Sequence, residues 1–259
     1  MKTLCTTNIR GGAGKTTDAT HLAIAGAIKK RRVLAVDLDP QHHLSLSLLA
    51  DLPADPNLFI SAALTGNLAQ PMKTNVPGLD LIPSHLEFSS TIEGILSHRK
   101  IHWEETLTRT LERFSGDYDY CVIDTPATYS RIHALAFHAS DGYLISLRPE
   151  AFSLLGFSES MEQVELFKEE CRIQNPKFLG YILNGVPKAH RKAVQRIKDE
   201  MHGDFENMGF DIPQDSIFDE IRWEGRATKS VFDFPGTTEY QDVFLKAWKT
   251  IEKRLEANA

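Results

Sequence analysis

The sequence predicts an α/β protein with a doubly wound, mostly parallel twisted sheet and helices on both faces. Short β-rich runs alternate with helical patterns along the chain, and this alternation is typical of parallel sheets built from strand–helix–strand units. Hydrophobic residues make up 42% of the 259 residues, which is enough for a full core. No linker, repeat or low-complexity segment divides the pattern, so we expect one domain over 1–259.

The expected elements can be placed in order along the chain. Strands are predicted at 3–9, 32–37, 79–83, 118–124, 142–149 and 178–184. Helices are predicted near 15–30, 86–97, 102–115, 129–139, 152–173, 189–203 and 236–256. The last helix carries apolar residues at i, i+3, i+4 and i+7 spacing from Tyr240 to Leu255, which indicates a buried stripe and disfavours a membrane-targeting tail.

Charge and cysteine content exclude several classes of protein. The formal net charge of −6 argues against a basic nucleic-acid coat protein, although it allows a local basic patch. The cysteines Cys5, Cys121 and Cys171 form no C-x-x-C pair. This indicates a reduced cytoplasm without disulfides, zinc or an iron–sulfur site. Cys5 and Cys121 are expected to pack in strands. The sequence has no signal-peptide pattern and no apolar stretch long enough to span a membrane.

The stretch "NIRGGAGKTT" joins the first predicted strand to the first helix. Consecutive glycines let backbone N–H groups point at phosphate oxygens at the start of a helix. Lys15 would then reach the β- and γ-phosphates, and the Thr16 hydroxyl would bind Mg²⁺. The predicted nucleotide contacts are Arg10, Gly11, Gly12, Ala13, Gly14, Lys15, Thr16 and Thr17. A strict Walker A loop has glycine five residues before Gly14, where this chain has Ile9.

Two further strands are predicted to end in carboxylates beside this loop. The second ends in "VDLDPQ", where Asp39 is expected to polarise the attacking water or hold a magnesium-bound water, while Asp37 supports the loop. The strand ending in "CVIDTPA" has the Walker B arrangement, which sets Asp124 beside Mg²⁺. The predicted metal-binding residues are therefore Thr16, Asp39 and Asp124.

In this order and at these separations, "RGGAGKTT", "DLDPQ" and "IDTPA" resemble the deviant Walker A ATPases, and within them the ParA group of DNA-partitioning ATPases. The resemblance covers nearly the whole chain and implies ATP and Mg²⁺ as cofactors. It matches Asp39 to the hydrolytic aspartate and Asp124 to the Walker B aspartate. It also implies that Asn184 reads the adenine, with Pro213 on the other side of the base.

The chain departs from the group at Arg10, where the group has a lysine that reaches the partner's phosphates across a nucleotide-sandwich dimer. Arginine keeps the charge and adds a rigid fork of donors that suits phosphate. We expect Arg10 to act catalytically in trans, much as an arginine finger does, with altered hydrolysis. The alternative is a surface or intramolecular ion pair.

The segment 187–200 is basic within an acidic chain. On a helix, Ala189, Ala193, Val194, Ile197 and Met201 would form the buried stripe, so the cations between them would face outward. Family members place basic residues further along as well. The predicted DNA-binding residues are Lys188, Arg191, Lys192, Lys198, Arg222, Arg226 and Lys229. No base-reading motif is present, so binding without sequence preference is expected. A solvated helix face is the alternative. A small insertion relative to the family leaves the register between 212 and 230 open.

The resemblance implies an ATP-dependent switch. ATP and Mg²⁺ would favour a homodimer that binds DNA, and hydrolysis stimulated by a ParB-type partner would release it. Cargo such as a plasmid, phage genome, chromosome region or protein assembly would be positioned on the nucleoid. The expected location is cytoplasmic and nucleoid-associated. The chain starts at its first strand, as in the short form without a helix-turn-helix extension. Two other functions stay open: a MinD-like positioning ATPase on membranes, and a metabolic P-loop ligase or small-molecule kinase.

Overall fold

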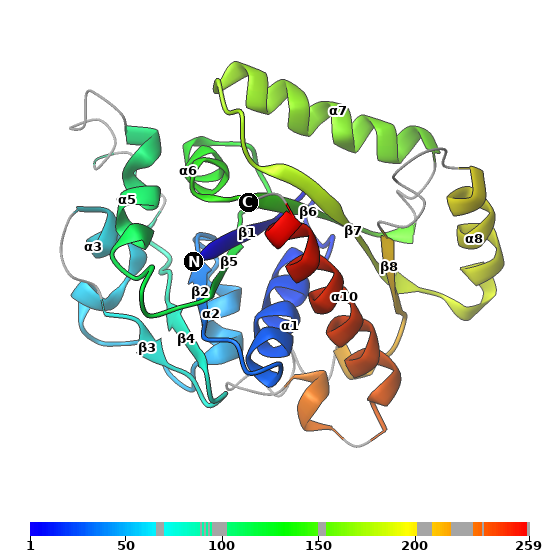
Figure 1. Cartoon of the computed structure of the whole chain (residues 1–259), viewed down its shortest axis with the longest axis horizontal. Helices are drawn as coiled ribbons and strands as arrows, with labels where there is room; N and C mark the ends of the chain where they lie inside the picture. Colours follow the sequence, from blue (N-terminus) through cyan, green and yellow to red (C-terminus); the bar gives the residue numbers. More distant parts are fainter. Residues whose placement is uncertain are drawn as a thin grey trace.

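The computed structural model describes residues 1–65, 70–88, 90, 92, 94, 103–149, 154–200, 209–218, 230–234 and 236–257. These residues form an eight-stranded sheet in the order β3-β4-β2-β5-β1-β6-β7-β8 (Figure 1). The strands are β1 (Lys2–Thr7), β2 (Val33–Asp37), β3 (Met72–Lys73), β4 (Leu79–Ile82), β5 (Tyr120–Asp124), β6 (Gly142–Leu147), β7 (Lys177–Val186) and β8 (Gly209–Pro213). Neighbouring strands are parallel except for β3 and β4, which pair antiparallel.

The helices alternate with the strands as the sequence predicts. They are α1 (Lys15–Ile28), α2 (His43–Leu48), α3 (Ile60–Thr65), α5 (Thr106–Glu112), α6 (Arg131–Ala139), α7 (Leu154–Glu170), α8 (Arg191–Glu200) and α10 (Thr238–Ala257). All six predicted strands are present, with ends shifted by a few residues. The short elements β3, β8, α2 and α3 were not predicted. Half of the residues of the predicted helix at 86–97 lie outside the described residues.

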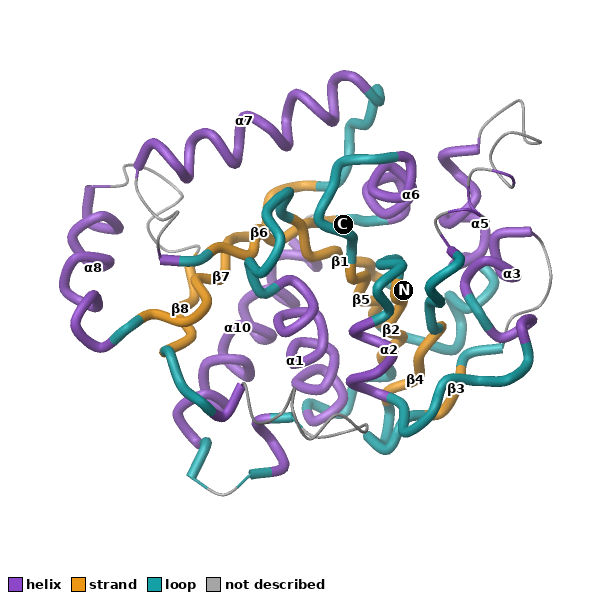
Figure 2. Tube along the Cα trace, turned by 180° about the vertical axis from the view of Figure 1, so that it is seen from behind, coloured by secondary structure: helices purple, strands orange, loops and turns teal. Residues whose placement is uncertain are grey.

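Helices cover both faces of the sheet, which confirms the doubly wound α/β class (Figures 1 and 2). Two clusters of buried apolar residues fill the space between the sheet and these helices. Successive strand residues point to opposite faces, so Leu4 packs in the layer with α1, α2 and α10, and Cys5 in the layer with α6 and α7. Cys5 and Cys121 are fully buried in the core as expected, and all three cysteines are free.

Helix α10 lies directly against α1 (Figure 1). A Cβ atom at Gly26 would stand 2.7 Å from the Trp248 ring, so only glycine lets the two helices approach this closely. Trp248 is 1% exposed, and Tyr240, Phe244, Ala247, Ile251 and Leu255 are buried with it. This confirms the predicted apolar stripe. Within the described ranges, none of the helices combines the length and the apolar character that crossing a bilayer requires.

The strand ends bring the motif residues to one edge of the sheet. β1 ends at Thr7 just before the glycine-rich loop, and β2 and β5 end at Asp37 and Asp124, which face each other in register. In open α/β sheets, ligands bind outside the carboxyl ends of the strands. The fold therefore places the candidate site at this edge, between β1, β2 and β5.

Candidate nucleotide-binding site

The loop between β1 and α1 has the backbone of a phosphate cradle. Gly12 and Gly14 adopt φ values of 72° and 102°, the left-handed region that favours glycine. A Cβ atom built at Gly11 or Gly12 would meet nothing within 4 Å, so this side of the loop is open. Gly14 caps α1 without a side-chain hydrogen bond, which leaves the N–H groups of the first turn for a ligand.

Lys15 is buried at the centre of the site. Its side chain is 6% exposed, and its Nζ donates to the Arg10 carbonyl oxygen over 3.5 Å, which curls the lysine back along the loop. Burial lowers the pKa of Lys15, and Asp124, Asp39 and Asp18 oppose this shift. The three carboxylates thus favour the cationic form of the lysine, which is the form that can bind an anionic phosphate.

Asp124 and Thr16 are already in contact. The Thr16 hydroxyl donates to Asp124 Oδ2 over 2.6 Å, and the Thr6 hydroxyl lies 3.4 Å from Oδ1. Asp124 is fully buried, and burial followed by repulsion from Asp37 raises its pKa to about 8. A hydroxyl and a carboxylate side by side are oxygen ligands of the kind Mg²⁺ prefers, so the two residues fit the cation.

Protein carboxylates alone do not form a complete cage. In the part of the chain that the structure describes, no group of three His, Cys, Asp or Glu side chains is arranged to hold a metal ion. Mg²⁺ typically keeps several waters and binds through one or two carboxylates and the substrate phosphates. The donor set at Thr16 and Asp124 is consistent with that pattern.

Asp37 and Asp39 have different environments. Asp37 is fully buried, and its Oδ2 accepts from the Ser45 amide at 2.8 Å and the Ser45 hydroxyl at 2.7 Å. Its Oδ1 accepts from the Asp39 amide at 3.0 Å, so Asp37 shapes the turn that carries Asp39. Burial raises the pKa of Asp37 to about 7. Asp39 is half-buried, and among the described residues its carboxylate accepts only from the Gln41 amide in its own turn, at 2.9 Å.

The Asn184 side chain packs against the backbone of the glycine-rich loop. Its amide nitrogen donates to the Ala13 carbonyl at 3.1 Å and to Asp18 Oδ2 at 2.8 Å. A Cβ atom at Gly14 would stand 2.4 Å from this nitrogen, so the loop rests directly on Asn184. On the neighbouring strand, Ile212 pairs with Asn184, and Pro213 follows it at the same edge. A role of Asn184 and Pro213 in contacting the base stays a prediction.

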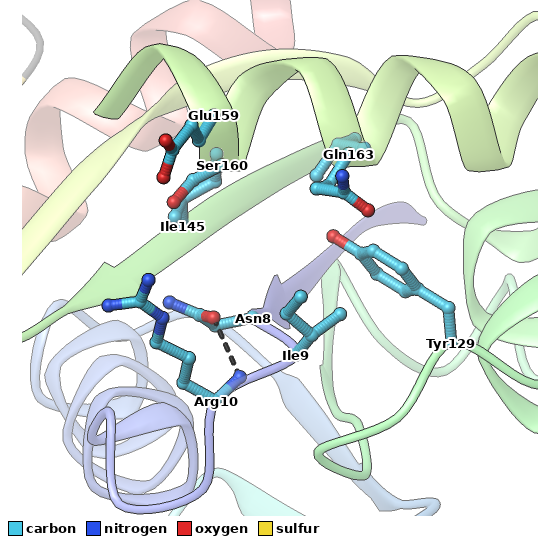
Figure 3. Close-up of a pocket in the computed structure, with 9 residues that line it drawn as sticks. Asn8, Ile9, Arg10, Tyr129, Ile145, Glu159, Ser160 and Gln163 are labelled. Carbon is cyan, nitrogen blue, oxygen red and sulfur yellow. Dashed lines mark hydrogen bonds between the residues drawn. The ribbon is translucent and has the colours of Figure 1, made fainter. Parts of the chain in front are cut away.

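Arg10 lies at the rim of the site. It is exposed, and its amide donates to Asn8 Oδ1 over 2.8 Å, which fixes the start of the loop. The residue lines a pocket of about 430 Å³ between the loop and α7 (Figure 3). Figure 3 shows its guanidinium pointing toward the end of α7 that carries Glu159 and Ser160.

The basic segment around α8 presents most of its predicted cations to solvent. Lys188, on a short 3₁₀ turn (Lys188–His190), is exposed, as are Arg191 and Lys192 on α8. Arg191 also pairs with Glu239 at the start of α10, at 3.2 Å. An exposed row of cations is the arrangement that a phosphate backbone requires.

The prediction that Lys198 faces outward is wrong. Lys198 is 8% exposed, and its Nζ pairs with Asp211 on β8 at 2.6 Å and lies 5.8 Å from the centre of the Tyr181 ring. The predicted buried residues Ala189 and Ala193 are instead exposed. The inner face of α8 consists of Val194, Ile197 and Lys198 at i, i+3 and i+4. The predicted contacts Arg222, Arg226 and Lys229, and Met201 of the predicted stripe, lie outside the described residues.

One buried carboxylate of the candidate site was not predicted from the sequence. Asp18, in the first turn of α1, is fully buried beneath the loop, and its carboxylate accepts hydrogen bonds from Ser146 and Asn184. A carboxylate among the small and apolar residues of "TTDATHLAIAGAI" is the signal that was available. Its partners come from β6 and β7, which the local pattern does not indicate.

Comparison with known proteins agrees with this geometry. A family model described as an AAA domain (AAA_31) matches residues 1–178. The chromosome partitioning protein ParA of Caulobacter vibrioides is 32% identical over 213 residues, 77% of this chain and 75% of that protein.

Two solved structures show the same fold. The septum site-determining protein MinD of Pyrococcus horikoshii, complexed with Mg-ADP, has a TM-score of 0.73 at 22% identity, covering 100% of this chain and 98% of its own. Cobyrinic acid a,c-diamide synthase of Mycobacterium smegmatis, with ADP and magnesium, has a TM-score of 0.71 at 22% identity, covering 96% of each chain. With its deviant Walker A loop and strand-end carboxylates, the chain belongs to the ParA/MinD family of P-loop ATPases.

Proposed function

We propose that this protein is an ATP-dependent dimerising switch that binds DNA without sequence preference in its ATP state and hydrolyses ATP to position DNA or other cargo. The observation that carries the proposal is the contact of Thr16 with Asp124 at 2.6 Å beside the buried Lys15. The exposed cations around α8 add the surface that DNA binding needs.

The chain's own residues have distinct tasks at the nucleotide. Bound Mg²⁺–ATP supplies the phosphoanhydride bond that is cleaved. The loop amides and the first turn of α1 hold the phosphates, and Lys15 neutralises their charge. Thr16 and Asp124 would hold the cation. Asp39, at the end of the turn that Asp37 shapes, orients the attacking water.

In this proposal, Arg10 acts outside its own protomer. Its side chain is exposed at the rim of the site, and the structure records no ion pair for it within the described residues. Across a dimer, the guanidinium would reach the partner's phosphates and couple ATP binding to association. A dimer would also double the number of α8 cations available to one DNA molecule, and affinity depends steeply on the number of phosphates neutralised.

In this proposal, release of the dimer from DNA and the direction of cargo movement require a second protein. A ParB-type adaptor bound to the cargo would stimulate hydrolysis, and the dimer would then separate and leave the DNA. Repeated cycles would move the cargo along the nucleoid. The relatives named as partitioning proteins support this part of the proposal by family membership alone.

The pocket beside Arg10 favours one second candidate, a P-loop enzyme that acts on a small molecule. Its volume of about 430 Å³ and its mixture of Arg10, Glu159 and apolar walls fit a small polar substrate. The fold shared with cobyrinic acid a,c-diamide synthase is compatible with it. Such an enzyme would not require DNA or a dimer.

The deciding experiment measures binding to a random-sequence DNA duplex with ATP–Mg²⁺, with ADP–Mg²⁺ and without nucleotide, at fixed salt. We expect binding with ATP alone, and weaker binding in Arg10→Ala. Arg131→Ala, which changes another arginine of the described chain, serves as the matched control. Absence of binding in every nucleotide state would exclude the DNA switch and direct attention to the small-molecule pocket.

A further inference from the structure

A buried polar cluster lies directly beneath the glycine-rich loop. It joins Asp18 on α1, Ser146 on β6 and Asn184 on β7, which are 0%, 0% and 5% exposed. Asp18 Oδ2 accepts from the Ser146 hydroxyl at 2.5 Å and from the Asn184 amide at 2.8 Å. None of the sequence motifs of the phosphate site includes Asp18 or Ser146, so the cluster needs its own explanation.

The cluster fixes which way the Asn184 amide is turned. An amide nitrogen carries two hydrogens, and here both are directed inward, to the Ala13 carbonyl at 3.1 Å and to Asp18. In the opposite orientation, Asn184 Oδ1 would face a carbonyl oxygen and a carboxylate, which are both acceptors. The two acceptors therefore hold Oδ1 on the outer side of the amide.

The outward Oδ1 atom is available to a ligand. It accepts no hydrogen bond from any residue that the structure describes, and it is not among the buried polar atoms that lack a partner, so solvent reaches it. Asn184 lies near the carboxyl end of β7, opposite Ile212 and beside the loop that receives the phosphates. A base attached to a nucleotide in that loop would meet an acceptor here and no donor from Asn184.

The Asp18 carboxyl is in an energetically unfavourable environment for a purely structural residue. Its Oδ1 atom is buried and has no hydrogen-bond partner among the residues that the structure describes, whereas buried polar atoms in native proteins are almost always paired. Burial raises the pKa of the Asp18 carboxyl well above its usual range.

We propose that Asp18 is a positioning residue that makes the site selective for adenine, because it holds Asn184 with only its carbonyl oxygen toward the base. The exocyclic amine of adenine can donate to that oxygen. Guanine and hypoxanthine carry a carbonyl oxygen at the equivalent position, and two facing acceptors repel each other. A site built to bind a donor rejects an analogue that lacks it. The inference rests on the proposed binding of ATP and adds its base selectivity.

The test is competition of ATP, GTP and ITP against a fluorescent ATP analogue in the wild type, Asp18→Leu and Asp18→Asn. We expect the wild type to prefer ATP over both competitors by about a hundredfold. Asp18→Leu has a similar size but no acceptor, and should lower that preference about tenfold, the factor that corresponds to one hydrogen bond. Asp18→Asn retains an acceptor oxygen and should restore the preference.

The outcomes separate this inference from the proposed function. A wild type that binds no nucleotide contradicts both, whereas equal affinity for ATP and GTP overturns the selectivity alone. If Asp18→Leu weakened the affinities for ATP and GTP equally, so that their ratio stayed unchanged, Asp18 would have only a structural role. If Asp18→Leu does not fold, Ser146→Ala removes the other hydrogen bond to Asp18 Oδ2 and should lower the ratio in the same direction by a smaller factor.

Discussion

The phosphate site and the α8 surface use charge in opposite ways. At the ends of β1, β2 and β5, the ionisable groups Lys15, Asp37 and Asp124 are 6%, 0% and 0% exposed. Asp37 raises the pKa of Asp124, and Lys15 lowers it. Around α8, Lys188 and Lys192 extend into solvent.

This difference separates two kinds of function. Buried charges act over short distances. They do not tolerate replacement, because removing one of them leaves its partner charge buried without water to solvate it. Exposed cations attract a polyanion additively and are screened by salt. Lys198 lies on α8 but is buried, unlike the exposed lysines of the same helix. It therefore allows buried and exposed charges to be compared within one helix.

The largest effect is expected for Asp124→Asn, which should lower ATP turnover a hundredfold or more, on the order of the loss of a preorganised charge in an active site. The amide cannot supply the negative charge beside Thr16 that the cation requires. Steady-state phosphate release measures it. Asp119→Asn is a matched control, because Asp119 precedes the same strand at its opposite end and pairs with the exposed Arg32. Comparable turnover in the two variants would contradict the assignment of Asp124.

A smaller effect is expected when two exposed cations are removed together. Lys188→Ala with Lys192→Ala should weaken DNA binding in the ATP state about tenfold and lower the slope of log affinity against log salt by about 1.8 per protomer, for two phosphate contacts. Fluorescence anisotropy over a salt series measures both. Lys246→Ala with Lys249→Ala removes the same charge from exposed positions of α10. Equal losses in the two double variants would indicate an effect of net charge rather than a binding surface.

Lys198→Met tests the buried member of the same helix. Methionine keeps an apolar stem but leaves Asp211, whose side chain is 36% exposed, without its partner. We expect a loss of about 1–2 kcal/mol in the free energy of unfolding, because the pair is only partly desolvated. Lys192→Met should change this free energy little. Urea unfolding gives the comparison, and a stable Lys198→Met with weakened DNA binding would restore the original prediction that Lys198 faces outward.

The parts of the site that the sequence predicts are those set by a strand and the residues directly after it. The glycine-rich loop follows β1, and Asp124 ends β5, so local pattern and parallel topology place them together. Their assigned roles in binding and hydrolysis stay predictions. The fold class follows for the same reason, since the alternation of strands and helices is a local signal.

The elements that were missed depend on contacts between distant segments. Asp18 acquires its role from Ser146 and Asn184, which are 128 and 166 residues away along the chain. The face of α8 was placed wrongly because alanines and lysine stems are both compatible with a half-buried helix face. The ion pair with Asp211 turns Lys198 inward, and Asp211 lies on β8, a strand that the sequence did not predict.

The smallest effect concerns the pH dependence of stability without nucleotide. The pKa of Asp124 rises from its unfolded value near 3.8 to about 8 in the folded protein, chiefly through burial and then through Asp37. The folded state therefore binds more protons between these values, and this group's contribution to stability is lost as pH rises through that window. Asp124→Asn removes the dependence, so the variant should gain stability relative to the wild type at pH 8 compared with pH 5. Thermal unfolding at both pH values measures the gain. Asp119→Asn, at the carboxylate that pairs with Arg32 before the opposite end of β5, is the control. If Asp124→Asn gained no stability at pH 8, ionisation of the Asp37 and Asp124 carboxyls would not oppose folding. The buried charges would then have as little effect on stability as the exposed charges of α8.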